Sequence, residues 1–435
     1  MVLKKILNSI FGKIHSSRKL DACLLCSHYN ENPILGLNSS LSQVKKIRKK
    51  RPPFIPNAKH LKEIDDFFTK NPNLQPYRHL LPKSIIEKKP YKTPDVLYLI
   101  SPDVATDVAN QLIKRISNKT HVIAESNPGL GLISELLLQN GFSSTRLYEG
   151  NLQFQNYLLK QFHGRKDQVK LFKKEFFRLY QYASLDKFDQ QGRVQFLLEH
   201  LPKREWSDDP FITVVGCLSK TSFLKFMIKS FILQTKLSTY GRVELFLLTQ
   251  KKHWDIFNAE PNPRSFKPWN VLMNLFLEAQ LIDKYPRKFF LPWETSMDKE
   301  EPDIKRDPDH IYLIRVILKR NLPLEQKDFA PFYCFMMHLY AWGGSSVIQT
   351  CEKWVPGCGE HLLLPRLEHK NYPKDLEIFT KFKELPINEV VPIYKEMASH
   401  PNFLSSPFMD MMEQEWLKSE TIETDLHDSQ LRKTN

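Results

Sequence analysis

From about residue 95 to residue 250, short apolar runs alternate along the chain with segments whose apolar residues recur every three or four positions. The short runs predict buried strands, and the three-to-four spacing predicts amphipathic helices. We expect strands at 121–125, 145–149, 169–172, 211–215 and 243–248. We expect helices at 132–140, 153–162 and 223–233. Strands that alternate with helices predict an α/β fold, a mostly parallel sheet with helices on both faces.

One helix start is marked especially clearly. Ser101 supplies an N-cap hydroxyl, Pro102 suits the first helical position, and Asp103 places a negative charge in the first turn. Apolar residues then repeat every four positions from Val104 to Ile116. We therefore expect a helix that begins at Pro102 and buries one face.

Beyond Pro292 the pattern changes. An acidic, polar stretch at 294–309 precedes a strand expected at 311–318 and helices expected at 328–342 and 389–399. The aromatic and Met residues of 328–342 have the spacing of a helix face, so we interpret them as packing residues.

A chain of 435 residues is too long for one compact core. We expect a targeting and basic segment at 1–50, an α/β domain at 60–320 and a helical domain at 321–435. The last residues, 421–435, are polar and are expected to fray.

The first twenty residues contain five basic residues and no acidic one, and their apolar residues follow helical spacing. An acid-poor amphipathic helix is typical of a mitochondrial transit peptide, and we expect roughly the first 20–50 residues to be removed on import. The alternative is an amphipathic helix of the mature protein that binds a partner or a membrane surface.

A dense basic block follows at 45–51. Its cationic residues are Lys45, Lys46, Arg48, Lys49, Lys50 and Arg51. Such a block next to nucleic acid would hold phosphates. A solvated tail or a nuclear localisation signal would have the same composition, although the amphipathic start of the chain argues against nuclear targeting.

The whole chain is strongly basic. It has 63 Lys and Arg against 49 Asp and Glu, a formal net charge of +14. This excess favours a polyanionic partner, nucleic acid or an acidic membrane surface, although organellar proteins are often basic in general. No apolar run approaches the roughly 20 residues that a membrane-spanning helix needs, so we expect no membrane insertion.

The six cysteines are too few and too scattered for a disulfide scaffold, and a reducing compartment is expected. Cys23 and Cys26 form one CxxC, but no second ligand pair stands at a spacing that would complete a zinc site. We expect no metal site.

The segment at 121–149 carries the candidate chemistry. Gly129 and Gly131 follow an expected strand and precede an expected helix, so the backbone can pass close to a ligand. Glu149 ends the next expected strand, where a carboxylate can accept hydrogen bonds from the ribose of an adenosine cofactor. The absence of a third glycine in a GxGxxG pattern disfavours a dinucleotide.

Five short motifs of the chain together resemble those of the rRNA adenine N6-dimethyltransferases, which use S-adenosyl-L-methionine. They are Leu99–Pro102, Glu125–Gly131, Tyr148–Glu149, Lys174–Phe177 and Tyr240–Glu244. The resemblance covers roughly residues 75–340. With the transit-like start, it is closest to the mitochondrial transcription factor B group of that family.

The resemblance implies a Rossmann-like S-adenosyl-L-methionine-dependent methyltransferase fold with a smaller C-terminal helical domain. It implies cofactor contacts at five residues: Ile100, Gly129, Gly131, Glu149 and Glu175. We expect the cofactor to be either bound or vestigial, with binding that a Glu149→Ala substitution would weaken.

The fourth-strand motif departs from the family. Active members end this strand with Gly-Asn-Leu-Pro-Tyr or a close variant, whereas this chain has Gly216 followed by Cys217, Leu218, Ser219 and Lys220. A thiol is a weak acceptor for the target amine, and a lysine cannot stack on a flipped adenine as a ring does. Each loss could cost about 1–3 kcal/mol, which predicts methyl transfer slowed by roughly two to four orders of magnitude.

Three functions remain open. The first, implied by the resemblance, is a transcription initiation factor that joins the mitochondrial RNA polymerase in the matrix nucleoid and holds melted promoter DNA. The second is an active dimethyltransferase of the small mitochondrial ribosomal RNA, which the retained Gly129, Gly131 and Glu149 favour. The third is a scaffold that binds the cofactor and has neither activity.

Overall fold

The computed structural model describes residues 58–86, 96–258, 268–292, 309–342, 345–364, 376–385 and 387–414. Several sequence-based predictions lie outside these residues. They are the transit peptide, the basic block at 45–51, the CxxC pair, most of the acidic stretch at 294–309 and the polar tail at 421–435.

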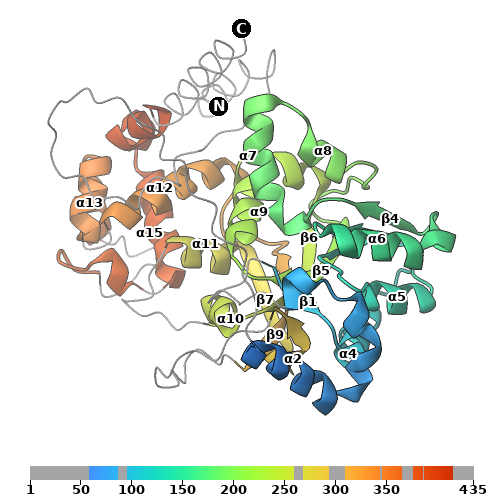
Figure 1. The fold of residues 1–435 in the computed structure, drawn as a ribbon. Coiled ribbons are helices and arrows are strands. Elements are labelled where there is room, and N and C mark those ends of the chain that lie inside the picture. Colours follow the sequence, from blue (N-terminus) through green and yellow to red (C-terminus); the bar gives the residue numbers. More distant parts are fainter. Residues whose placement is uncertain are drawn as a thin grey trace, which may run out of the picture.

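The centre of the protein is a seven-stranded sheet with the strand order β4-β3-β2-β5-β6-β9-β7 (Figure 1). Its strands are β2 (Ile123–Ser126), β3 (Thr145–Tyr148), β4 (Val169–Phe172), β5 (Ile212–Leu218), β6 (Val243–Thr249), β7 (Leu277–Pro286) and β9 (His310–Leu318). The strands from β4 to β6 pair in parallel, whereas β9 is antiparallel to both β6 and β7. This order, with one antiparallel strand inserted near the edge, is that of the Rossmann-like S-adenosyl-L-methionine-dependent methyltransferases. The predicted fold class is confirmed.

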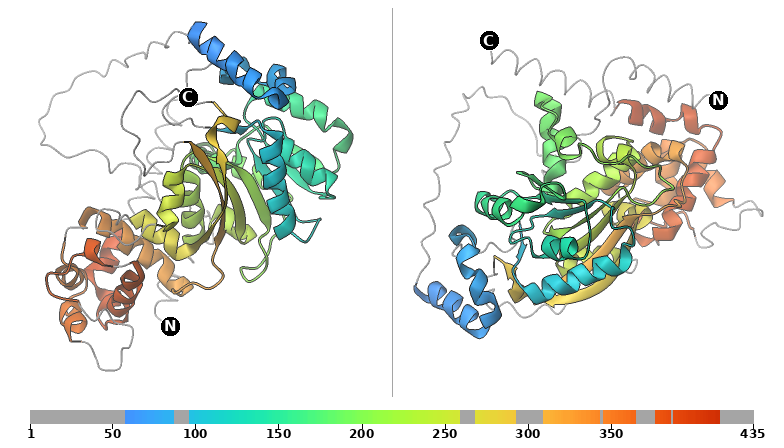
Figure 2. Two further views of the ribbon diagram at one scale, coloured as in Figure 1. Left: turned by 90° about the horizontal axis from the view of Figure 1, so that it is seen from below. Right: turned by 90° about the vertical axis from the view of Figure 1, so that its right-hand side faces the viewer.

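Helices cover both faces of the sheet because its central strands are apolar on both sides (Figure 2). Val214 and Leu218 of β5 pack toward one face, and Val215 and Cys217 pack toward the other. The first face is covered by α7 (Leu179–Asp189), α8 (Arg193–Leu197), α9 (Ser222–Ile232) and α11 (Pro268–Phe276). The second face is covered by α4 (Pro102–Arg115), α5 (Leu132–Gln139) and α6 (Leu152–Gln161). One more helix, α10 (Lys251–Asn258), follows β6.

The N-terminal helices lie over one end of this sheet. They are α2 (Ala58–Lys70), η1 (Pro72–Leu80) and α3 (Lys83–Ile86). Phe68 and Leu74 of this segment share a hydrophobic cluster with Tyr98, Leu130 and Leu291. Tyr98 belongs to β1 (Tyr98–Leu99), which pairs antiparallel with β8 (Phe290–Leu291) in a separate two-stranded sheet.

The C-terminal helices share the core of the sheet domain. They are α12 (Phe329–Trp342), α13 (Val347–Trp354), α14 (Cys358–Leu363) and α15 (Ile387–Ser399), drawn orange to red in Figure 1. The ring of Phe329 lies 5.1 Å from that of Phe231 and 5.7 Å from that of Phe276, centroid to centroid. Phe332 and Phe335 are fully buried, which confirms that the aromatic residues of α12 are packing residues.

Most elements between 100 and 250 fall within a few residues of their predicted bounds. The helix expected from Pro102 is α4, and the Oγ of Ser101 accepts a hydrogen bond from the N–H of Val104 at 3.4 Å. Within the described residues, no helix is long and apolar enough to cross a bilayer.

Candidate cofactor and substrate site

The predicted site lies where the strand order reverses direction. Successive strands run from β2 toward β4 on one side and from β5 toward β9 on the other, so β2 and β5 flank the switch point. Open α/β sheets bind their ligands in the crevice outside the carboxyl ends of such strands. The glycine loop follows β2 and the altered fourth-strand motif ends β5, so both predicted motifs meet at this edge.

The glycine loop has the tight backbone that the sequence predicts. Asn127, Gly129 and Gly131 have φ values of 57°, 57° and 67°, in the left-handed region that favours glycine. A Cβ at Gly131 would lie 2.8 Å from Cδ2 of Leu158, so this position also has no room for a side chain. The loop then enters α5 with Gly131 at its N-cap.

Glu125, near the end of β2, is buried, and its carboxylate is hydrogen-bonded to Ser134 of α5. Its Oε2 accepts hydrogen bonds from the N–H of Ser134, at 3.1 Å, and from the Ser134 hydroxyl. Burial raises the pKa of this carboxyl to about 7, although the bonds from Ser134 act in the opposite direction.

Glu149 directly follows β3, where a strand end was predicted, and its side chain contacts the glycine loop. Its Oε2 accepts from the N–H of Gly129 at 3.1 Å. Its Oε1 accepts from the N–H of Asn151 at 2.7 Å and from the hydroxyl of Tyr98 at 3.2 Å. The residue is 0% exposed, and burial raises the pKa of its carboxyl to about 7.

Tyr98 is the residue of this site that the sequence interpretation missed. A Cβ added at Gly129 would lie 3.0 Å from Cδ1 of Tyr98, so the tyrosine ring covers the glycine directly. The ring also packs against Phe154, with 4.8 Å between ring centroids. A tyrosine within an apolar run needs a partner for its hydroxyl, and that requirement is the signal that could have indicated its role.

The arrangement does not fit a bound adenosine cofactor. A ribose would need acceptor positions on Glu149 and open space beside Gly129, whereas three donors of the chain already bind the carboxylate and the Tyr98 ring fills the space. Two buried atoms nearby, Ser126 Oγ and Asn127 Oδ1, have no hydrogen-bond partner among the described residues. These two atoms could bond to a ligand, but they do not provide the acceptor and the space that a ribose needs beside Gly129.

The other two predicted cofactor residues also face protein. Glu175 follows β4, and its Oε2 accepts from Nε of Arg178 at 2.9 Å. Its Oε1 would lie 2.9 Å from a Cβ at Gly150, so this carboxylate lies beside the residue that follows Glu149. Ile100 is buried in the cluster under the N-terminal helices, and its N–H donates to the carbonyl of Phe289 at 3.0 Å.

At the end of β5, Cys217 points into the core between the sheet and α4 and α5. Burial raises the pKa of this thiol to about 12, so it is neutral at physiological pH. Leu218 is buried on the opposite face, and Lys220 is exposed in the loop that follows. None of these side chains supplies the amide oxygen that a target adenine amine would need.

Aromatic side chains fill the space beside the end of β5. A Cβ at Gly216 would lie 3.2 Å from Cε2 of Phe177, so this ring packs against the strand backbone. The Phe177 ring lies 5.2 Å from that of Phe223, centroid to centroid, and both residues are buried. Both rings therefore lie beside the backbone at the carboxyl end of β5.

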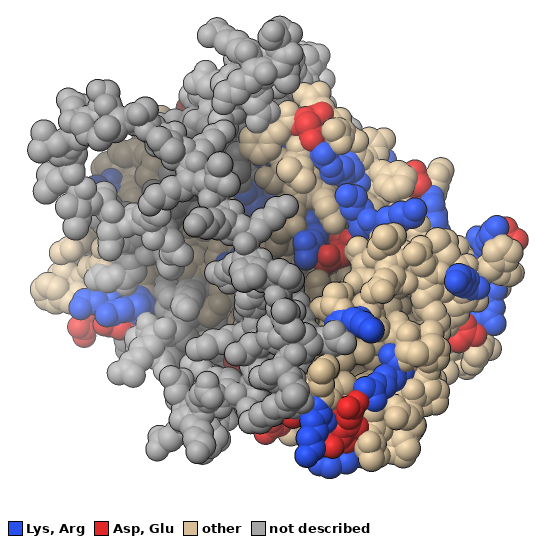
Figure 3. Space-filling view, viewed as in Figure 1, with Lys and Arg blue, Asp and Glu red and all other residues tan. Residues whose placement is uncertain are grey.

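Positive charge lies along the same edge of the sheet. Lys173 and Lys174 follow β4, Lys220 follows β5, and all three are exposed. The three spacings from β4 to β5 place the two groups about 14 Å apart along the same edge. In Figure 3, blue side chains gather over the region between α8 and β4. The described residues contain no group of three His, Cys, Asp or Glu side chains that could hold a metal ion.

No protein-family profile matches the chain. Among known proteins, the one named dimethyladenosine transferase 2, mitochondrial, from Drosophila melanogaster is 25% identical over 395 residues, covering 82% of this chain and 87% of that protein. The human protein of the same name is 22% identical over 275 residues, covering 60% of this chain and 68% of that protein. These relatives confirm the resemblance to the rRNA adenine dimethyltransferases.

Solved structures similar to the chain include the 23S rRNA methyltransferase ErmE, with a TM-score of 0.43 and 11% identity, covering 69% of this chain and 100% of that one. A dimethyladenosine transferase from Plasmodium falciparum has a TM-score of 0.40 and 11% identity, covering 69% of this chain and 96% of that one.

Proposed function

We propose that this chain, a relative of dimethyladenosine transferase 2, is a mitochondrial transcription initiation factor built on a methyltransferase fold. In this proposal it joins the mitochondrial RNA polymerase in the matrix nucleoid and holds melted promoter DNA. Methyl transfer is weak or absent.

The observation that carries the proposal is the end of β5. Cys217 stands where the family resemblance calls for an asparagine, and its neutral thiol faces the core between the sheet and α4 and α5. The chain therefore has no side chain there to orient an adenine amine. A chain that has the methyltransferase fold but lacks a side chain for methyl transfer would use that fold to bind a partner.

The binding partner is nucleic acid that is held mainly through phosphates. The chain has a net charge of +14, and Lys173, Lys174 and Lys220 are exposed along the carboxyl edge of the sheet. Contacts of this kind carry little sequence information, so promoter choice falls to the polymerase and other factors. Separated strands suit this edge better than intact duplex, because the methyltransferases that the chain resembles receive an unstacked base there.

The mitochondrial location rests on the acid-free amphipathic pattern of the first residues and on the names of the relatives. A fusion of residues 1–50 to a fluorescent protein should accumulate in mitochondria. A fusion that stays in the cytosol would remove this part of the proposal.

The second candidate function is methylation of the small mitochondrial ribosomal RNA. The left-handed Gly129 and Gly131 and the nearby Glu149 favour it, since they preserve the backbone of a cofactor loop. Incubation of the protein with a small-subunit rRNA hairpin and labelled S-adenosyl-L-methionine distinguishes the two. Dimethylation at the rate of an active family member would establish the second function.

Reconstituted transcription tests the first function. The mitochondrial RNA polymerase of the same species should start from a linear promoter only when the full chain is added. S-adenosylhomocysteine, which blocks methyl transfer, should leave the amount of transcript unchanged. A polymerase that initiates equally well without the chain would end the proposal.

A further inference from the structure

We propose that Tyr98 is a built-in occupant of the cofactor site, standing where the ribose of an adenosine cofactor would bind and excluding it. The inference concerns ligand binding and holds whether or not the chain serves transcription.

The contacts of Tyr98 match those that a bound ribose would make. Its hydroxyl donates to Oε1 of Glu149 at 3.2 Å, the acceptor that a ribose hydroxyl would use. Its ring lies against the Cα of Gly129, where the glycine leaves room for a ligand. Phe154, near the start of α6, packs against the Tyr98 ring and also lies near Gly129. Tyr98 therefore fills both the polar and the apolar half of that position.

In this arrangement Glu149 binds other parts of the chain instead of a ligand. It joins three separate segments, through the Tyr98 hydroxyl, the N–H of Gly129 and the N–H of Asn151. The carboxylate is 0% exposed, so no part of it remains for a molecule from solution. A residue that the family uses to hold a cofactor here holds the protein together.

Tyr98 is fixed in place by more than its own side chain. Its backbone pairs with Leu291 between β1 and β8. Its side chain lies in the hydrophobic cluster of Ile64, Phe68 and Leu74 from the N-terminal helices. A ligand could enter only if this cluster opened, since the Tyr98 ring cannot leave without separating from those helices.

Calorimetric titration with S-adenosylhomocysteine tests the proposal on the full chain. The wild-type protein should show no saturable binding at millimolar ligand. Tyr98→Ala removes the ring and the hydroxyl. Its affinity for the ligand should be at least about tenfold higher than the weakest affinity that the wild-type titration could detect. Adding Glu149→Ala to that variant should abolish the gain, because the ribose acceptor is then missing.

Tyr77→Ala is the matched control. Tyr77 packs against the same hydrophobic cluster from η1, whereas the atoms nearest to a Cβ at Gly129 belong to Tyr98 and Phe154. This variant should not bind S-adenosylhomocysteine. That result would show that binding by Tyr98→Ala comes from removal of the Tyr98 side chain and not from a general loosening of the cluster.

Tyr98→Phe tests the hydrogen bond separately and keeps the core filled. It should exclude the ligand like the wild type and melt a few degrees lower, because Glu149 loses one donor. An unchanged melting temperature would show that the Tyr98–Glu149 bond is not formed.

Two further results would overturn the proposal. One is saturable binding by the wild type at the affinity of Tyr98→Ala. The other is a folded Tyr98→Ala, judged by its circular dichroism and cooperative melting, that still does not bind.

Discussion

The buried carboxyls Glu125 and Glu149 make this protein sensitive to pH at the scale of single residues. The pKa of each is raised from 4.5 to about 7, mainly by burial. Between these values the folded state binds protons that the unfolded state does not. The resulting stability is fully present below pH 4.5 and is lost as the pH rises through about 7.

A Glu149→Gln substitution should therefore flatten the pH dependence of stability. The wild type should lose up to about 3 kcal/mol of stability between pH 5 and pH 8 as Glu149 ionises. The variant should not lose this part, because the amide never ionises, so its free energy of unfolding should rise relative to that of the wild type. Urea denaturation at several pH values measures this difference. Glu278→Gln, on the exposed side of β7, is the control and should leave the curve unchanged. If the Glu149 variant follows the wild-type slope, the buried carboxylate does not titrate in this window.

The sequence predicted which residues gather at the cofactor loop but not what fills the loop. Gly129, Gly131 and Glu149 could be found because their roles follow from a local strand–loop–helix order. The contribution of Tyr98 depends on pairing between β1 and β8, which are far apart in the chain. No spacing within the sequence reports such a contact.

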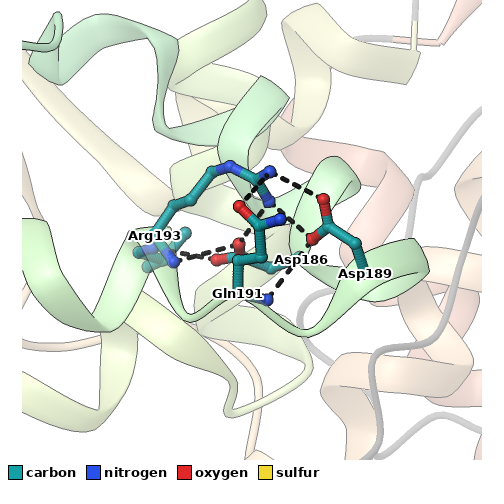
Figure 4. A network of polar contacts seen from close by, with 5 residues as sticks. Asp186, Asp189, Gln191 and Arg193 are labelled. Atoms are coloured by element: carbon teal, nitrogen blue, oxygen red, sulfur yellow. Dashed lines mark hydrogen bonds and ion pairs between the residues drawn. The ribbon is translucent and has the colours of Figure 1, made fainter.

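At the scale of elements, the turn between α7 and α8 is held by a compact polar network (Figure 4). Oδ1 of Asp186 accepts from the N–H of Arg193 at 3.0 Å, and its Oδ2 accepts from the N–H of Val194 at 2.9 Å. These are first-turn amides of α8, which no earlier turn of that helix can satisfy. Arg193 also pairs with the exposed Asp189, at 2.6 Å. Asp186 thus caps α8 from the helix before it.

An Asp186→Ala substitution should destabilise the protein by about 1–3 kcal/mol, because it leaves the buried amide of Val194 and the half-buried amide of Arg193 without this acceptor. Asp189→Ala is the control and should have a small effect, since it removes a surface ion pair and one exposed hydrogen bond, from the N–H of Gln191. Urea midpoints of the two variants measure the difference. Equal effects would mean that the surface pair, and not the cap, holds the turn.

The sequence predicted the strands at the centre of the sheet better than those at its margins. β5 and β6 are apolar on both faces and therefore stand out as continuous runs. β7 was not predicted, because its buried and exposed positions are mixed and a register shift falls between Leu281 and Asp283. The antiparallel insertion of β9 between β6 and β7 follows from tertiary packing and leaves no local pattern.

At the scale of the whole molecule, the excess of positive charge should dominate binding to DNA. Replacing Lys173, Lys174 and Lys220 together with Ala should weaken binding to single-stranded DNA. It should also lower the slope of log affinity against log salt by about 2, at about 0.7 per phosphate contact. Lys114→Ala is the control, because Lys114 is exposed near the end of α4, at the opposite edge of the sheet. An unchanged slope in the triple variant would place the DNA elsewhere on the chain.

The central claim is that this protein holds promoter DNA open for the polymerase, and one comparison tests it most directly. Transcription by the mitochondrial RNA polymerase is measured on a linear duplex promoter and on the same promoter with a pre-melted bubble, each with and without the chain. The account predicts strong dependence on the chain for the duplex and much weaker dependence for the bubble. Equal dependence on both templates, or full activity on duplex without the chain, would contradict it.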